Sequence, residues 1–172
     1  RSPHTSAMTS AVSSTNFGYI SALAVSSITA SITDNDTAGV TITESGGTTN
    51  VTEGGATDDF TVVLDTAPTS TVEITFTTST MGVTLSTSTI SFSSTNWNVA
   101  QTITVTATND SNDEPSPHTS TITSAVSSTN FGYTSALAVA SITASITDND
   151  TAGVTITESG GSTNVTEGGA TD

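Results

Sequence analysis

The chain has 172 residues, of which sixteen are Asp or Glu and only one is Lys or Arg, giving a formal net charge of −15. A charge of this sign repels nucleic-acid phosphates and anionic lipid and attracts cations, which excludes a nucleic-acid-binding protein and favours divalent metal as a partner. Cysteine is absent, which excludes disulfides and thiolate metal sites, and no apolar run is long enough to insert into a membrane.

Alternating apolar and hydroxyl residues predict an all-β chain. Ser and Thr make up 69 of the 172 residues, and in runs such as 102–108 they alternate with Ile, Val and Ala, the period of a half-buried strand. In chain order, we expect strands over 39–43, 50–53, 59–64, 71–78, 83–86, 89–92, 101–108, 119–127 and 138–147. Such short strands, separated by Gly, Pro, Asn and Asp turns and with no helix, predict an antiparallel two-sheet β-sandwich of the immunoglobulin-like kind.

A long internal repeat organises the sequence. Residues 2–58 return as residues 116–172, displaced by 114 positions, with only five differences. The acidic triplets 34–36 and 148–150 each separate one alternating run from the next and are expected to be linkers. We therefore expect three parts: 1–36, the C-terminal part of a preceding repeat; 37–150, one complete sandwich; and 151–172, the N-terminal part of the following repeat. A larger array of such units is the expected whole protein.

The acidic residues are expected to gather at one end of the complete sandwich. In antiparallel strands every second connection lies at the same end, which groups Glu53, the acidic loop 109–114 and the triplet 148–150, with Asp58 and Asp59 nearby. Crowded carboxylates without Lys or Arg favour a bound cation, and oxygen ligands without His or Cys favour Ca²⁺. The alternative is that these Asp and Asn residues only form turns.

Several motifs together resemble the Calx-beta module and related repeats of giant bacterial surface proteins and adhesins. They are Val51-Thr-Glu53-Gly, Phe60-Thr-Val-Val-Leu64, the run from Ile103 to Asp110, the acidic loop to Glu114, and Ser145-Ile-Thr-Asp-Asn-Asp150. The resemblance implies that calcium is bound by Glu53, Asp110, Asp113, Glu114, Asp148 and Asp150. It further implies metal roles for Asp34 and Asp36 in the preceding repeat and for Glu167 in the following one.

No residue pattern predicts an enzyme. His4 and His118 are one repeat position in loops beside Pro, where a surface or end-capping role is expected, and no catalytic residue is assigned. Trp97 and the segment 131–133 are expected either to close one end of the sandwich or to stack on sugar rings.

The sequence favours a non-enzymatic structural module, extracellular and on the cell surface, whose calcium-stiffened repeats form a stalk or filament that serves cell adhesion. Its expected partners are the neighbouring repeats of the same chain, and identical chains in a fibre are a further candidate, including by exchange of terminal strands. The alternative is an adhesive module that binds a polysaccharide or a partner module through its end loops or an exposed sheet edge.

Overall fold

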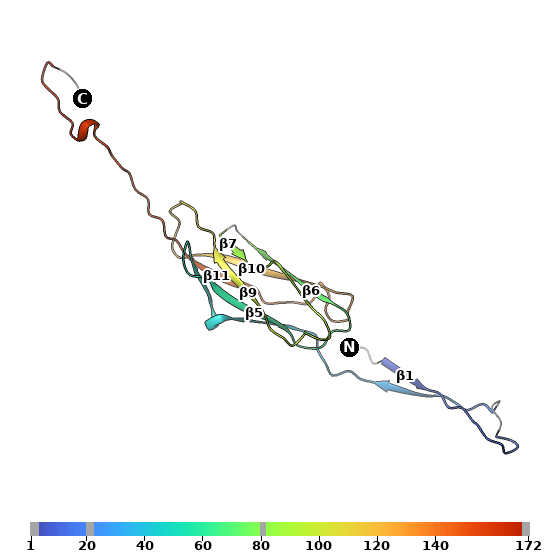
Figure 1. Cartoon of the computed structure of the whole chain (residues 1–172). Coiled ribbons are helices and arrows are strands. Elements are labelled where there is room, and N and C mark those ends of the chain that lie inside the picture. Colours follow the sequence, from blue (N-terminus) through green and yellow to red (C-terminus); the bar gives the residue numbers. More distant parts are fainter. Residues whose placement is uncertain (1–3, 20–22, 80–81, 170–172) are drawn as a thin grey trace.

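The computed structural model describes residues 4–19, 23–79 and 82–169 (Figure 1). Its strands are β1 (His4–Met8), β2 (Ile28–Ile32), β3 (Val40–Glu44), β4 (Thr49–Thr52), β5 (Asp58–Leu64), β6 (Val72–Thr78), β7 (Val83–Leu85), β8 (Thr89–Phe92), β9 (Gln101–Ala107), β10 (His118–Ser127) and β11 (Ile142–Thr147). Two three-residue 3-10 helices, η1 (Ser45–Gly47) and η2 (Ser159–Gly161), complete the elements. Among the described residues, no helix has the length and hydrophobicity needed to cross a membrane.

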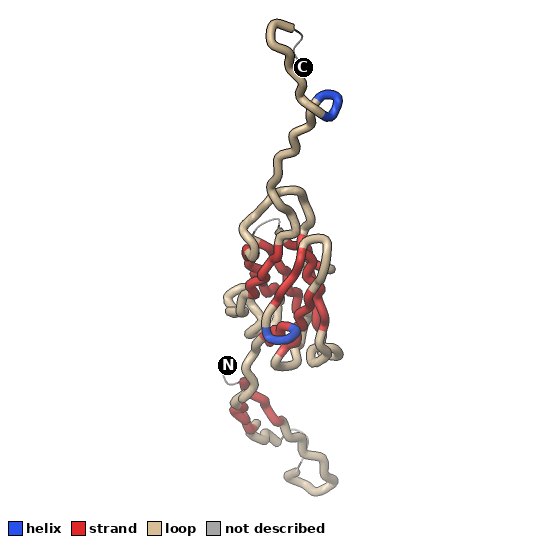
Figure 2. The backbone as a smooth tube through the Cα atoms, turned by 90° about the vertical axis from the view of Figure 1, so that its left-hand side faces the viewer, coloured by secondary structure: helices blue, strands red, loops and turns tan. Residues whose placement is uncertain are grey.

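The strands β3 to β11 form a two-sheet β-sandwich, as predicted. One sheet has five strands in the order β4-β11-β10-β6-β8, and the other has four in the order β3-β5-β9-β7. Figure 2 shows these strands running lengthwise through the central body, with the β1–β2 hairpin outside it. The strands pair antiparallel with one exception, the pair β4 and β11.

Alternation along each strand builds the core between the sheets. In β6, every second residue from Val72 to Phe76 is buried while the residues between them, including Glu73, are exposed. Phe60 of β5 meets Phe76 across the sheets, with ring centroids 5.5 Å apart in an edge-on arrangement. Thr and Ser occupy most outward positions, so a thin core and an uncharged polar surface come from the same two-residue pattern.

The parallel pair arises because the first part of the sandwich changes sheets. β3 belongs to the four-stranded sheet, the turn η1 follows it directly, and β4 continues in the same direction beside β11. Gly46 has a φ of +65°, a backbone conformation that L side chains rarely adopt, which allows this sharp crossing. The sequence predicted no helix, and this is wrong at η1 and η2, each of which is a single tight 3-10 turn.

Two parts of the chain lie outside the sandwich, beyond its opposite ends (Figure 1). The β1–β2 hairpin repeats the pairing of β10 and β11 position for position, from His4 opposite Ile32 to Met8 opposite Ile28. Residues 151–169 repeat the sequence of β3 and β4 but form no strand. The hairpin lacks equivalents of β4 and β6, and the C-terminal segment lacks equivalents of β5 and β11, so the apolar residues of both copies remain exposed.

Candidate metal centre

The acidic residues converge where β4, β9 and β11 end, here called the exit end because residues 151–153 leave the sandwich there. Glu53 directly follows β4 and Asp148 directly follows β11. The parallel register places Thr52 opposite Thr147, so the two strands finish side by side. The Glu53 backbone N–H then donates to the Thr147 carbonyl over 3.0 Å, which holds the two carboxylates at one corner.

Glu53 is the buried member of the cluster. Its side chain is 3% exposed, and its Oε2 atom is buried without a hydrogen-bond donor. Burial raises the pKa of Glu53 above its ordinary value of 4.5; the backbone N–H of Asp110 partly offsets this, and the carboxylates of Asp148, Asp110 and Glu114 raise it further. Among the described residues there is no Lys or Arg to compensate the charge of an ionised Glu53.

The carboxylate of Asp148, in contrast, accepts backbone hydrogen bonds on both of its oxygens, which hold it in place. Its Oδ1 accepts the Asp150 N–H over 3.0 Å and its Oδ2 accepts the Glu114 N–H over 2.8 Å. These backbone donors, that of Asp150 foremost, lower the pKa of Asp148 below 3.8. Asn149 adds a brace, because its Nδ2 donates to the Glu53 carbonyl over 3.0 Å and to Asn109 over 2.9 Å. The acidic loop and the two strand ends are thus tied together by hydrogen bonds.

Two overlapping groups of side chains could each surround a cation. Glu53, Asp148 and Asp150 form one, and Glu53, Glu114 and His118 form the other; in each group one ligand atom per residue lies within 4.8 Å of the rest. Two further carboxylate oxygens, Oδ2 of Asp150 and Oδ1 of Asp59, are also buried without a donor. Buried carboxylate oxygens without donors are costly unless a cation meets them, so this donor set fits a hard divalent ion such as Ca²⁺.

The other predicted ligands belong to neither of these two groups. Asp110 contributes its N–H and charge to Glu53, and Asp113 lines a separate hollow with Asp150. Asp58 is engaged elsewhere, since its Oδ2 accepts the Asn50 N–H over 2.8 Å. The structure does not bring Asp34, Asp36 and Glu167 to the exit end: the first two lie near the opposite end of the sandwich, and Glu167 is exposed in the C-terminal segment.

His118 is the residue that sequence reasoning missed. It was expected at the surface, and oxygen ligands without a nearby His were the stated reason for favouring Ca²⁺. The structure places His118 at the start of β10, with its Nε2 atom 3.3 Å from Oε2 of Glu114. The spacing of four residues from Glu114 was the available signal, but it becomes meaningful only because the loop between them folds back.

The opposite end of the sandwich, here called the base, carries the aromatic loops. Tyr133 is 0% exposed; its hydroxyl donates to the Thr66 carbonyl over 2.7 Å and accepts the Thr66 N–H over 3.1 Å. Trp97 is partly buried against the core, whereas Phe131 is 67% exposed. Tyr133 therefore closes the base and is not available for stacking on a sugar, while Phe131 faces solvent.

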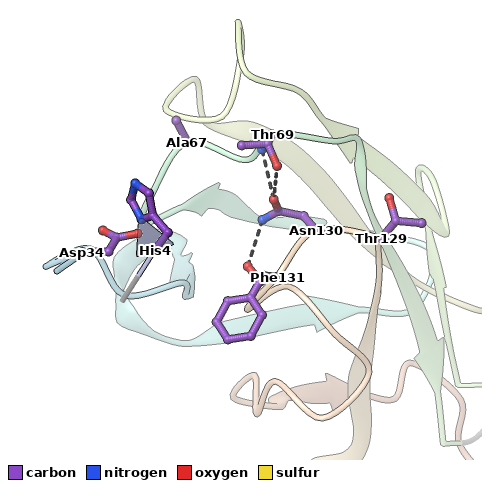
Figure 3. A pocket seen from close by; sticks show the side chains of 7 residues that line it. All are labelled: His4, Asp34, Ala67, Thr69, Thr129, Asn130 and Phe131. Atoms are coloured by element: carbon purple, nitrogen blue, oxygen red, sulfur yellow. Dashed lines mark hydrogen bonds between the residues drawn. The ribbon is translucent and has the colours of Figure 1, made fainter. Parts of the chain in front are cut away.

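A pocket at the base is lined partly by the sandwich and partly by residues of the N-terminal segment (Figure 3). Its sandwich side is formed by Ala67, Thr69, Thr129, Asn130 and Phe131, and its other side by His4 and Asp34. Asn130 fixes the loops, because its Oδ1 accepts the Thr69 N–H over 3.1 Å. His4 and Asp34 are the sequence copies of His118 and Asp148, so the residues that face the base belong to the exit end of the preceding unit.

Comparison with solved structures gives several similarities, of which two are described here. No family model matches the chain, and no curated protein matches it. The D0-D1 domain of intimin is similar over 72% of this chain and 55% of that one, with 24% identity and a TM-score of 0.39. Domains 4 and 5 of the S-layer protein SbsC are similar over 71% of this chain and 59% of that one, with 17% identity and a TM-score of 0.36. The chain thus spans less than two thirds of either protein, and its resemblance to Calx-beta modules stays a prediction.

Proposed function

We propose that this chain is a non-enzymatic structural repeat of a large extracellular surface protein, and that Ca²⁺ bound at each exit end stiffens the array into a stalk or filament. The observation that carries the proposal is the buried Glu53 carboxylate, whose Oε2 atom has no hydrogen-bond donor, within a group of like charges. Glu53, Asp148 and Asp150 would hold the ion, with Asp110 and Glu114 adding negative charge. A bound divalent cation would supply positive charge that no Lys or Arg among the described residues supplies.

The position of the cluster supports a role in joining repeats. The residues of the acidic triplet 148–150 are the last before the chain enters the next copy of the unit. A cation that ties Asp148 and Asp150 to Glu53 would fix the direction in which residues 151–153 leave the sandwich. In an array where each unit touches only its neighbours, the stiffness of these exits sets the stiffness of the whole.

The base pocket supports the same proposal from the other side of the joint. His4 and Asp34 lie against the base loops, so the exit end of one unit and the base of the next would meet (Figure 3). Extracellular calcium modules commonly bind with dissociation constants on the order of 10⁻⁴ to 10⁻³ M, which suits an environment where calcium is plentiful. Exposed Phe131 at this pocket is the one observation that favours the alternative, an adhesive module that binds a polysaccharide.

Calorimetric melting of the chain in EDTA and in calcium tests the metal part of the proposal. At a calcium concentration roughly a hundredfold above the dissociation constant, one site should add about 2.7 kcal/mol to the free energy of unfolding. Small-angle scattering of a protein with several consecutive repeats should then give a longer, straighter particle in calcium than in EDTA. An unchanged melting temperature would refute calcium binding, whereas polysaccharide binding that persists in EDTA would favour the alternative.

A further inference from the structure

We propose that Glu53, Glu114 and His118 form a second cation site at the exit end, one that takes a borderline transition-metal ion such as Zn²⁺. The site goes beyond the proposed calcium function: it shares Glu53 with the calcium group but requires neither Asp148 nor Asp150. Its three residues come from the end of β4, the acidic loop and the start of β10. Each offers one ligand atom, and the three atoms lie within 4.8 Å of one another.

The first argument is the state of Glu53. Its side chain is almost fully buried, and Oε2 has no hydrogen-bond donor. A buried carboxylate oxygen without a donor must meet a cation, take up a proton or bear the cost of lost hydration. This oxygen is an observation separate from the crowding of acidic residues, and it points to a positively charged occupant of the cluster.

The second argument is the orientation of the imidazole. Nδ1 of His118 lies 3.2 Å from the Pro115 carbonyl oxygen. A carbonyl oxygen can only accept, so Nδ1 is the donor in this contact and Nε2 faces Oε2 of Glu114 at 3.3 Å. A cation placed between Nε2 and this oxygen would be bound by both atoms. A backbone carbonyl that fixes the far nitrogen is the usual support of a metal-binding histidine.

The chemistry of the ligands selects the type of ion. Calcium and magnesium take oxygen ligands, whereas an imidazole nitrogen combined with carboxylates suits zinc and its first-row neighbours. Glu53, Glu114 and His118 line one hollow together with Asp110 and Thr119, which leaves room for water as a further ligand. Asp150 lines a different hollow with Asp113. The proposed histidine site and Asp150 therefore line separate hollows at the exit end.

The chain contains a matched control for His118. His4 occupies the same repeat position and begins the equivalent strand β1, but residues equivalent to Glu53 and Glu114 do not accompany it within the described residues 4–19 and 23–36. If an exposed histidine were sufficient to bind the metal, substitutions of His4 and His118 would weaken zinc binding to the same extent. If the site needs all three ligands, only His118 will matter.

Isothermal titration of the full chain with ZnCl₂, in buffer that already holds excess calcium, tests the proposal. One zinc ion per chain should bind, His118→Ala and Glu114→Gln should each weaken it at least tenfold, and His4→Ala should leave it unchanged. Titration with Co²⁺ adds a spectroscopic readout, because loss of the His118 nitrogen should shift the visible absorption of the bound ion. A cooperative thermal melt of each variant in EDTA shows whether it still folds.

The outcomes separate this site from the calcium site. Zinc binding retained in Asp150→Asn, together with a lost calcium effect, would support two sites. Zinc binding to a wild-type chain that shows no calcium effect would support the histidine site while refuting the proposed function. Zinc affinity unchanged in both His118→Ala and Glu114→Gln would overturn the proposal, as would the absence of zinc binding, which would leave His118 as an imidazolium paired with carboxylates.

Discussion

Replacement of Glu53 by Gln should change the stability of the protein in opposite directions with and without calcium. The substitution keeps the shape of the side chain and removes its charge. Without metal, the raised pKa of Glu53 shows that its ionised form is disfavoured by burial and by three neighbouring carboxylates, so the variant should be more stable than the wild type. With calcium, the variant loses a ligand shared by both candidate cation groups and should gain little from the metal.

The size of the calcium effect follows from mass action. About 10 mM calcium is roughly a hundredfold above a dissociation constant on the order of 10⁻⁴ M and should add about 2.7 kcal/mol. For a sandwich of this size, that corresponds to a rise in melting temperature on the order of 10 °C. The wild type should show this rise, and Glu53→Gln should lose most of it.

Differential scanning calorimetry of wild type and variant, in EDTA and in calcium, measures both expected changes in melting temperature. Glu73→Gln is the matched control, because Glu73 is an exposed residue near the start of β6 and its replacement removes the same charge away from the exit end. The control should follow the wild type in both buffers. A Glu53→Gln variant that melts lower than wild type in EDTA, or keeps the full calcium shift, would refute the account of Glu53.

Three further predictions concern pH, the base and the core. In EDTA, the free energy of unfolding should rise as the pH falls through the raised pKa of Glu53 toward 4.5, because the folded state takes up that proton before the unfolded state does. Below pH 3.8 it should fall again, as the stabilising contribution of ionised Asp148 is lost. A steady decline from neutral pH in denaturant titrations would contradict this prediction. Tyr133→Phe should cost about 1–3 kcal/mol in urea unfolding, because it leaves buried backbone groups without the hydroxyl, and a cost near zero would show that water replaces it. Ile142→Ala should cost about 2–5 kcal/mol, since Ile142 is 3% exposed, whereas the same change at Ile28, the copy that is 64% exposed, should be nearly neutral; equal costs would mean that the hairpin is buried in solution.

Much of the fold follows from a local pattern. Alternation of Thr or Ser with apolar residues predicted all nine strands of the sandwich, most of them within one or two residues of the observed ends. The largest error is at β11, which begins at Ile142 where the sequence predicted residue 138. Residues 138–141 are mostly apolar and continue toward the strand in sequence, but they lie beyond the end of the pairing with β10, which stops at Ile122 opposite Ile142. A strand needs a hydrogen-bonding neighbour, which alternation by itself does not report.

The candidate site was predictable to a lesser extent. Counting strands placed Glu53, the acidic loop and the triplet 148–150 at one end, and the structure places them there. The side-chain roles needed the tertiary contacts: Asp148 accepts two backbone N–H groups, whereas Glu53 is buried with one oxygen unpartnered. The two residues look equivalent in the sequence, and the positions of the donors around them make them different.

The internal repeat shows which features follow from the local sequence and which depend on distant contacts. The length of the unit, the alternation that makes it β and the excess of carboxylates without basic partners can all be read from the amino-acid sequence alone. Tertiary structure decided that β4 runs parallel to β11 and that His118 joins the acidic cluster. It also decided that Ile142 is core while its copy Ile28 is exposed, because burial depends on the strands that a residue meets, which residues far away in the chain supply.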